Sequence, residues 1–339
     1  MKGLEFDSQS LTTVKELTSQ ATSIAIIAHR NADGDAMGSL LGMYHILSDL
    51  NPKAKITPLL PNGCPKQFTW MPHSELILNG DTQLEACNTA LMESELVIGV
   101  DFNVPSRVDF LETALVASPA KKILIDHHHN PDMEHFNVVI SRSGLSSACE
   151  LVYWVAQAVW GDSVISQDAA RCIYTGICTD TGSFSYSCEQ PSLYEAAAAL
   201  VAKDINAADI HNHINNTFSI ERMRFFGFAI SERLHIYEKE KFAYFSFSLK
   251  DQQEHNISAA DMEGLVNYTL MMEQIEVGVL IREEASRTKI SFRSKNDVDV
   301  NLIARTHFGG GGHTKAAGAD SPYSFEETIH RVKELFISE

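Results

Sequence analysis

The fold is decided by one stretch in which an apolar strand runs into a polar turn: Ser23-Ile-Ala-Ile-Ile-Ala-His29-Arg-Asn-Ala-Asp33-Gly-Asp35-Ala-Met-Gly-Ser39. The first six residues are typical of a strand that is covered on both faces. Residues 36–50 then follow the pattern of a helix. In an open parallel sheet, the loop after such a strand holds functional groups. The histidine and the two aspartates of this turn are therefore candidate site residues.

Strands and helices continue to alternate along the first half of the chain. Further strands are predicted at residues 55–60, 96–100 and 122–125, and further helices at 83–92 and 146–160. Strands that alternate with helices indicate βαβ units and a mainly parallel sheet flanked by helices. Because residues 167–216 are mostly of helical pattern, we predict one α/β domain over residues 1–204.

A helical connector is predicted at residues 205–217, followed by a smaller α/β domain over residues 218–339. The pattern of this second domain predicts a hairpin, two further strands and a final helix, at residues 234–248, 275–281, 288–293 and 325–336. A glycine run, Gly309-Gly-Gly-Gly312, precedes the final helix.

Composition excludes several classes of protein. The 339 residues contain 27 Lys and Arg against 44 Asp and Glu, a formal net charge of −17. This excludes a broad basic face that coats duplex nucleic acid, because phosphate neutralisation needs clustered cationic side chains. The six cysteines form no CxxC pair, and no apolar run is long enough to span a bilayer or to form a signal-like core. We therefore expect a cytoplasmic protein with reduced thiols and no membrane segment.

Four segments rich in carboxylates and imidazoles are predicted to meet at one edge of the first sheet. They are the turn quoted above, Asp101, the run Asp126-His-His-His129, and Asp180. So many anions would repel one another unless divalent cations lay between them. Six ligand positions, with Asp101 and Asp180 able to bridge, suit two ions about 3.5–4 Å apart. An Asp/His set without thiolate favours Mn²⁺, with Mg²⁺, Co²⁺ or Zn²⁺ as alternatives.

Each segment taken alone has a simpler explanation. An aspartate after a strand usually forms a turn or caps a helix, and a histidine triplet usually lies on the surface. All four segments, however, fall at positions where a parallel sheet places its ligands. One shared site explains this better than four unrelated local causes.

The same residues resemble the four motifs of the DHH phosphoesterase superfamily. In addition, Phe308-Gly-Gly-Gly-Gly-His313, with Ser291-Phe-Arg-Ser294 upstream, resembles the DHHA1 domain of the nanoRNase and pAp-phosphatase branch. The resemblance covers nearly the whole chain in the family's order. It implies an active site in the cleft between the two domains and a homodimer formed through the first domain.

The resemblance also implies two metal sites. One would be held by His29, Asp33, Asp101 and Asp180, and the other by Asp35, Asp101, His127 and Asp180. Asp126 would orient a histidine, and His128 would face the scissile phosphate as charge stabiliser or proton donor. His129 extends the motif by one imidazole that the family pattern does not require.

The second domain is expected to bind the substrate, chiefly through Arg293 and His313. The full set of expected substrate contacts is Arg107, Arg282, Arg293, Ser294, Gly310, Gly311, Gly312 and His313. A glycine run lets backbone N–H groups approach an anion closely. Taken alone, however, such a run is more often a flexible turn, and arginines on strands are often surface residues.

The function that the resemblance implies is metal-dependent hydrolysis of a phosphoester in a short RNA or DNA oligonucleotide or a small nucleotide. Short oligoribonucleotides would be degraded to mononucleotides, or the 3′-phosphate of adenosine 3′,5′-bisphosphate would be removed. The alternative is a phosphodiesterase for cyclic dinucleotides or their linear products. An inorganic pyrophosphatase is disfavoured by the glycine-histidine signature, and a full-length RecJ-type exonuclease by chain length and the lack of a basic groove. A non-catalytic nucleotide-binding module would lack metal ligands, and none is missing.

Overall fold

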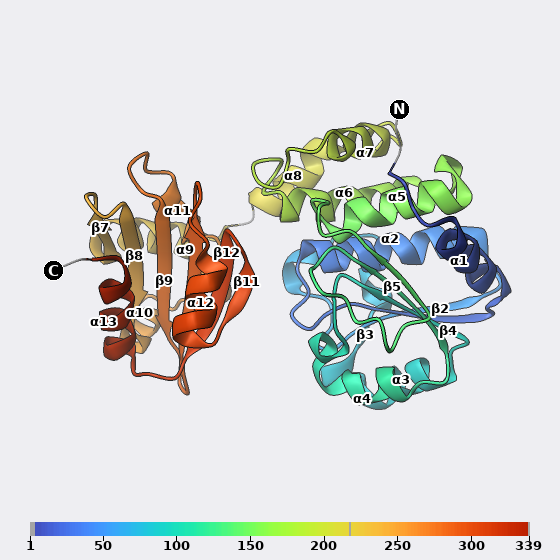
Figure 1. The fold of residues 1–339 in the computed structure, drawn as a ribbon, viewed down its shortest axis with the longest axis horizontal. Helices are drawn as coiled ribbons and strands as arrows, with labels where there is room; N and C mark the ends of the chain where they lie inside the picture. The colour runs from blue at the N-terminus through green and yellow to red at the C-terminus, as the bar shows by residue number, and fades with distance from the viewer. Residues whose placement is uncertain (1–3, 217, 338–339) are drawn as a thin grey trace. The chain divides into compact units, whose positions relative to one another are not determined.

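The computed structural model describes residues 4–216 and 218–337, and the chain divides between residues 217 and 218 into two compact units (Figure 1). The predicted connector contains helix α8 (Ala207–Asn215). Its last residue, Thr217, and the ends of the two predicted domains, residues 1–3 and 338–339, lie outside the described residues. Over the part of the chain that is described, every helix is too short or too polar to cross a bilayer.

The sheet of the first unit is fully parallel, with the strand order β3-β2-β1-β4-β5-β6. Its strands are β1 (Ser23–Ile27), β2 (Lys55–Leu60), β3 (Leu78–Asn79), β4 (Leu96–Val100), β5 (Lys121–Asp126) and β6 (Val138–Ser141). The predicted parallel α/β architecture is therefore confirmed. The order of the strands reverses between β1 and β4, and in such sheets the loops on either side of that point open the crevice where ligands bind.

Helices cover both faces of this sheet (Figure 1). On one side of the sheet lie α1 (Ser8–Gln20), α2 (Gly34–Leu50), α5 (Ala148–Trp160) and α6 (Gln167–Asp180), with α7 (Pro191–Val201) and α8 packed outside α5 and α6. On the other side lie α3 (Gly80–Glu93), the 3₁₀ segment η3 (Pro105–Leu111) and α4 (Glu112–Ala117). Ile24 and Ile26 enter the core on the side of α2, whereas Ala25 and Ile27 enter the core on the side of α3. Alternate side chains of β1 thus enter different cores, which explains why its four buried residues are all apolar.

Helices α2 and α6 run antiparallel in close contact. A Cβ atom at Gly38 would lie 2.5 Å from the carbonyl oxygen of Cys172, and one at Gly42 would lie 2.6 Å from Cγ1 of Ile173. At the beginning of α2, a Cβ atom at Gly34 would meet the side chain of Thr179. Glycines on one face of α2 therefore let the two helices approach, and this packing brings the start of α2 to the end of α6.

The second unit is built on a mixed sheet with the order β11-β12-β10-β9-β8-β7, in which only β8 and β9 are parallel neighbours among the described strands. Its strands are β7 (Leu234–Tyr237), β8 (Phe242–Phe247), β9 (Val277–Glu283), β10 (Thr288–Ser294), β11 (Gly311–His313) and β12 (Ala316–Ser321). Helix α9 (Ile220–Phe228) packs on one face, and α12 (Val300–Phe308) and α13 (Phe325–Phe336) pack on the other. The predicted hairpin, two strands and final helix are all present.

Candidate metal centre

The loop after β1 places His29 beside two carboxylates. The Nδ1–H of His29 donates to the carbonyl oxygen of Arg30 at 2.8 Å. This bond directs Nε2 inward, 3.3 Å from Oδ2 of Asp101 and 3.8 Å from Oδ1 of Asp33. Burial lowers the pKa of His29, which favours the neutral imidazole that metal ions require.

Asp33 and Asp35 lie at the beginning of α2 with different surroundings. Asp33 caps the helix, because its Oδ1 accepts from the backbone N–H groups of Asp35 and Ala36 at 3.1 and 3.0 Å. Asp35 is buried, and its two carboxylate oxygens accept from the N–H groups of Ala148 and Cys149 at 2.7 and 2.8 Å. Burial raises the pKa of Asp35 even so. The first turn of α5 thus supports this carboxylate, a contact that the sequence did not reveal.

Asp101 occupies the centre of the site. It follows β4 in the left-handed region, with a φ of 57°, which is uncommon for a residue other than glycine. Its backbone N–H donates to the carbonyl oxygen of Ile125 at 3.1 Å, and its side chain is buried. Within the described chain, Oδ1 of Asp101 accepts no hydrogen bond. Burial, together with the nearby carboxylates, raises the pKa of Asp101 well above its usual range.

An orphaned, buried carboxylate oxygen is costly and needs an explanation. A bound cation would neutralise Asp101 and supply the missing partner for Oδ1. Two facts therefore indicate that the residues around Asp101 fit a metal ion: the unpartnered Oδ1, and the carboxylate and imidazole chemistry of the group.

The run after β5 directs two histidines to different tasks. The Nδ1–H of His128 donates to Oδ1 of the fully buried Asp126 at 2.7 Å, and the His128 backbone N–H donates to Oδ2 at 3.0 Å. By contrast, Nε2 of His127 lies 3.7 Å from Oδ2 of Asp35, 3.7 Å from Oδ1 of Asp101 and 3.6 Å from Oδ2 of Asp180. His128 is thus held by Asp126, whereas His127 faces the carboxylate cluster.

Asp180 is the last residue of α6, and the α2–α6 packing brings it to the cluster. About a third of its side chain (31%) is exposed. Loss of hydration among its neighbours and the negative charges of Asp35 and Asp33 still raise the pKa of Asp180 well above its usual range. His129, the optional third imidazole, contributes its backbone carbonyl to a 2.8 Å hydrogen bond from the Asn103 side chain.

All six predicted metal ligands lie together and form what we call the first cluster. Two groups of three each have donor atoms within 4.8 Å of one another: His29, Asp33 and Asp101, and Asp35, His127 and Asp180. A third group, Asp101, His127 and His128, links them. The thiol nearest to the cluster, Cys149, is fully buried, and burial raises its pKa well above the usual range, so it stays protonated. The groups that can hold metal ions here are carboxylate oxygens and imidazole nitrogens.

Arg293 and His313 of the second unit lie in one row of the sheet. Arg293 on β10 and His313 on β11 are each paired with Ala316 of the intervening strand β12. Residues that are directly opposite each other in antiparallel strands point to the same face, so both side chains lie on one face, two strands apart. At about 4.8 Å a strand, their backbones are separated by roughly 10 Å. The structure thus brings together the two residues from which we expected most substrate binding.

Three other expected substrate contacts are engaged within the second unit. Arg282 forms an ion pair with Glu284, and the hydroxyl of Ser294 donates to the carbonyl oxygen of Val298 at 2.7 Å. The N–H of Gly310 donates to the carbonyl oxygen of Ala304 at 3.0 Å at the end of α12.

Close packing requires glycine at some positions of the run 309–312. From the sequence alone, this reason for the glycines could not be distinguished from anion binding. A Cβ atom at Gly310 would lie 2.1 Å from the carbonyl oxygen of Gly318. Gly312 has a φ of 150°, and a Cβ atom there would lie 2.5 Å from the carbonyl oxygen of Ala316. A Cβ atom at Gly311 would lie 3.8 Å from its nearest neighbour, Oδ1 of Asn301. Close approach of β11 and α12 to β12 therefore explains two of the glycines and leaves Gly311 tolerant.

Arg107 lies in η3, exposed, and close to the first cluster. Its positive charge is one of the causes, after burial, that lower the pKa of His29. Its backbone carbonyl accepts from the N–H of Arg30 at 2.9 Å, which joins η3 to the loop that carries the first ligands.

Comparison with known families and proteins finds matches to both units of the chain. The model of the DHH family, N-terminal domain, matches residues 23–177, and that of the DHHA1 domain matches residues 239–338. The bifunctional oligoribonuclease and PAP phosphatase NrnA of Mycoplasma pneumoniae is 28% identical over 300 residues, 87% of this chain and 86% of that protein. The protein of the same name from Bacillus subtilis is 28% identical over 317 residues, 91% of this chain and 93% of its own length.

A solved structure shows the same fold over the same length. The crystal structure of an exopolyphosphatase-related protein from Bacteroides fragilis superposes with a TM-score of 0.93 and 32% sequence identity, covering 97% of this chain and 96% of that one. This chain therefore belongs to the DHH family of phosphoesterases, with a DHH N-terminal domain followed by a DHHA1 domain.

Proposed function

We propose that this chain hydrolyses short oligoribonucleotides to mononucleotides and removes the 3′-phosphate of adenosine 3′,5′-bisphosphate. The observation that carries the proposal is the cluster of carboxylates and imidazoles around Asp101, whose buried Oδ1 has no hydrogen-bond partner in the described chain. The two relatives from Mycoplasma pneumoniae and Bacillus subtilis are named as bifunctional oligoribonucleases and PAP phosphatases, and each matches this chain over nearly its full length. This supports the choice of substrate.

The cofactor we propose is a pair of divalent cations, with Mn²⁺ as the preferred ion for an oxygen and nitrogen donor set. One would be held by His29, Asp33, Asp101 and Asp180, and the other by Asp35, Asp101, His127 and Asp180. When bound, such a pair lowers the pKa of a water molecule and neutralises charge on the phosphate.

The chain's own residues would position and protonate the reacting groups. Asp126 fixes the His128 ring through a 2.7 Å hydrogen bond to Nδ1 and stabilises the protonated imidazolium. His128 would donate a proton from Nε2 to the leaving oxygen, a step for which an imidazole is well suited near neutral pH. The α5 N–H groups hold Asp35 in place so that its carboxylate does not turn away.

The second unit would bind the part of the substrate that does not react. Arg293 and His313, on one face of the sheet, provide a cationic and a hydrogen-bonding group that suit a phosphate or a base. Arg107, close to His29, would contact the scissile end. The net charge of −17 fits a short substrate, because a long strand would need many more cationic contacts. We also propose a homodimer, which light scattering of the purified protein would test.

The test is product analysis with the full chain, stripped of metal and then loaded with Mn²⁺. The substrates are 5′-labelled di- to pentanucleotides, adenosine 3′,5′-bisphosphate and a cyclic dinucleotide, each with an Asp101→Asn control and a chelator control. Release of mononucleotides and of phosphate that needs both metal and Asp101 is expected. Preference for the cyclic dinucleotide would move the chain to the alternative function. No turnover by protein that holds the metal would contradict both.

A further inference from the structure

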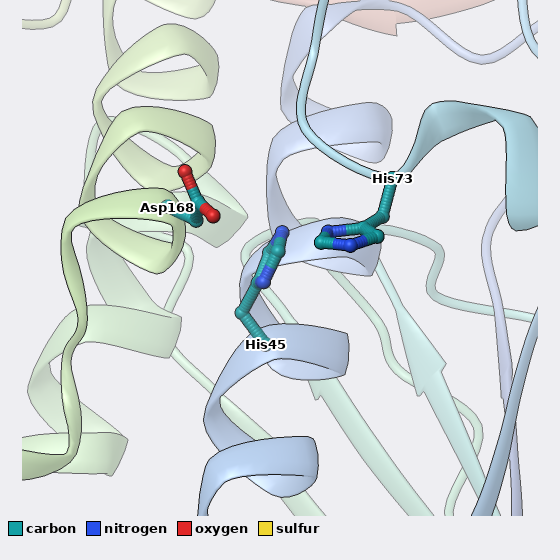
Figure 2. Close-up of side chains that lie close together, drawn as sticks. All are labelled: His45, His73 and Asp168. Atoms are coloured by element: carbon teal, nitrogen blue, oxygen red, sulfur yellow. The ribbon is translucent and has the colours of Figure 1, made fainter.

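A second group of candidate ligands lies at the other end of the α2–α6 pair (Figure 2). It consists of His45 on α2, His73 in the turn before the 3₁₀ segment η2 (Ser74–Leu76), and Asp168 in the first turn of α6. One ligand atom from each side chain lies within 4.8 Å of the other two. Figure 2 shows the His45 ring between the Asp168 carboxylate and the His73 ring.

This group is separate from the first cluster. His45 follows Asp35 by ten residues on the same helix, which corresponds to about 15 Å along the helix axis. Asp168 precedes Asp180 by twelve residues on α6, or about 18 Å. Each of the two helices therefore carries a candidate catalytic ligand near one end and a member of the second group towards the other.

His45 is the fixed member of the group. It is one turn beyond Gly42, on the part of α2 that packs closely against α6, and it is buried, with 6% of its surface exposed. Burial lowers the pKa of His45, which favours the neutral form that binds metal. Its Nε2 lies 3.3 Å from the carbonyl oxygen of Pro72, slightly beyond the usual range for such a hydrogen bond, so this contact competes weakly with a metal bond.

His73 is held so that its ring faces His45. Its backbone is left-handed, with φ 62° and ψ 19°, a conformation that few residues other than glycine adopt. The two rings are 5.0 Å apart between centroids, with planes inclined by 60°. The Tyr44 ring packs against both, at 5.4 Å from His45 and 5.9 Å from His73.

We propose that His45, His73 and Asp168 form a further metal site, separate from the two around Asp101, for a divalent transition metal of the Zn²⁺ type with a water molecule as the fourth ligand. Two imidazoles and one carboxylate are a ligand set that Zn²⁺ binds, with an open position left for solvent. Bonds of about 2.0–2.2 Å in a tetrahedron require donor atoms about 3.4 Å apart. His73 and Asp168 are exposed, so their side chains can turn the remaining distance towards the buried His45.

Explanations without a metal account for the residues singly. Asp168 suits the first turn of a helix, where a negative charge is favourable, and His73 packs on Tyr44. Neither explains why both donors face a third, buried donor that comes from a different helix. A metal ion would join α2, α6 and the turn at His73, and so fix the helix pair whose opposite ends hold Asp35 and Asp180.

The test counts Zn²⁺ per chain by mass spectrometry after the purified full-length protein has been equilibrated with the ion and freed of excess. His73→Gly removes one ligand, and glycine takes the left-handed conformation at no steric cost. Asp168→Ala removes another ligand. The control is His330→Ala, the loss of an exposed histidine in the second unit that pairs with Glu334. One equivalent of Zn²⁺ fewer in each ligand variant, with the wild-type number in the control, is expected.

A second measurement distinguishes Zn²⁺ bound at this group from metal bound at the first cluster. Zn²⁺ is expected to raise the Tm of the wild type by more than it raises that of His73→Gly, while Mn²⁺-dependent phosphoesterase activity stays the same in both. The proposal is overturned by His73→Gly and Asp168→Ala proteins of native circular dichroism that bind as many Zn²⁺ ions as the wild type. An equal rise in Tm would overturn it as well.

Discussion

Two sets of acidic side chains, one in each unit, have pKa values shifted in opposite directions. In the first, Asp35, Asp101 and Asp180 are crowded together, and loss of hydration raises the pKa of each. In the second, Asp251 lies 2.7 Å from Arg233, and hydrogen bonds from Arg233 and Ser248 outweigh the effect of burial and lower its pKa. The Asp251 carboxylate, which is paired with an arginine of the same unit, is structural. Carboxylates that the chain leaves crowded mark the place where a partner from outside, here a cation, belongs.

The largest effect is expected from Asp101→Asn. Asparagine tolerates the positive φ at this position, so the backbone is kept. We expect kcat/KM to fall by at least about 10³-fold, more than the 10–100-fold typical of residues that only support a ligand. Because the variant removes a buried carboxyl group whose Oδ1 has no hydrogen-bond partner in the described chain, the Tm of the metal-free protein is expected to rise.

Asp251→Asn is the matched variant in the second unit. Its carboxylate is held by Arg233, so its loss is expected to lower the Tm and to leave kcat nearly unchanged. Calorimetry of the chelated proteins and steady-state kinetics check both statements. If both variants changed Tm in the same direction, the contrast between the units would be wrong.

The pair formed by His128 and Asp126 is expected to give the next effects. His128→Gln should lower kcat by about 10²–10³-fold, because proton transfer to the leaving oxygen is lost. Asp126→Asn should cost less, about 10–100-fold, because Asp126 acts on the substrate only through the His128 ring. Steady-state kinetics with one substrate checks both values, and a larger loss of kcat in Asp126→Asn than in His128→Gln would contradict this assignment of roles.

Arg293 on β10 and Arg282 on β9 lie on neighbouring strands and are expected to differ in their effect on substrate binding. Arg293→Ala is expected to raise KM for a dinucleotide by about 10–100-fold with little change in kcat, because a hydrogen bond to a charged group is worth about 1.5–3 kcal/mol. Arg282 is paired with Glu284, so Arg282→Ala should leave KM close to that of the wild type. Kinetics with one substrate for both variants decides this, and equal increases in KM would place Arg282 at the substrate too.

The smallest effect is a pH dependence of the metal-free protein. The folded pKa of Asp101 is raised above its unfolded value of about 3.9, so the folded state holds the extra proton between these two values. The contribution of Asp101 to the free energy of unfolding therefore falls as the pH rises through that window.

The measurement is Tm against pH for the chelated wild type and for Asp101→Asn. As the pH falls from 7 towards 5, the wild type should gain a few degrees relative to the variant. Asp251, whose pKa is lowered, has the opposite sign: its stabilisation is present above the unfolded pKa and is lost as the pH falls through the folded one. Parallel curves for wild type and Asp101→Asn would show that Asp101 does not titrate in this range.

Much of the fold could be predicted because its central elements carry strong periodic signals. The strand at Ser23–Ile27, buried on both faces, and the final helix Phe325–Phe336 were located within one or two residues. The edge strands β3 and β6 are two and four residues long, too short to show a period. Strand β12, Ala-Ala-Gly-Ala-Asp-Ser, lacks the branched and aromatic residues typical of strands, because β11 and α12 approach it closely.

The first site was more accessible to prediction than the second. His29, Asp101 and His127 follow strands of a parallel sheet, and topology alone brings such positions together. Asp180 ends a helix, so its place depends on the α2–α6 packing, which no local pattern shows. The glycine run was ambiguous for the same reason: the close approach of β12 that requires Gly310 is a contact between segments. The group at His45 left no local signal, since its three members come from separate elements.

The spread of the candidate ligands along the first unit also has a consequence for the timing of protein synthesis. The candidate ligands are spread from His29 to Asp180, and the last of them must wait for α6 to pack on α2. A ribosome that translates this chain therefore carries no complete set of these ligands beside its message until more than half of the protein has been made. Chains that end before Asp180 are expected to be harmless to RNA, so premature termination releases an inert product.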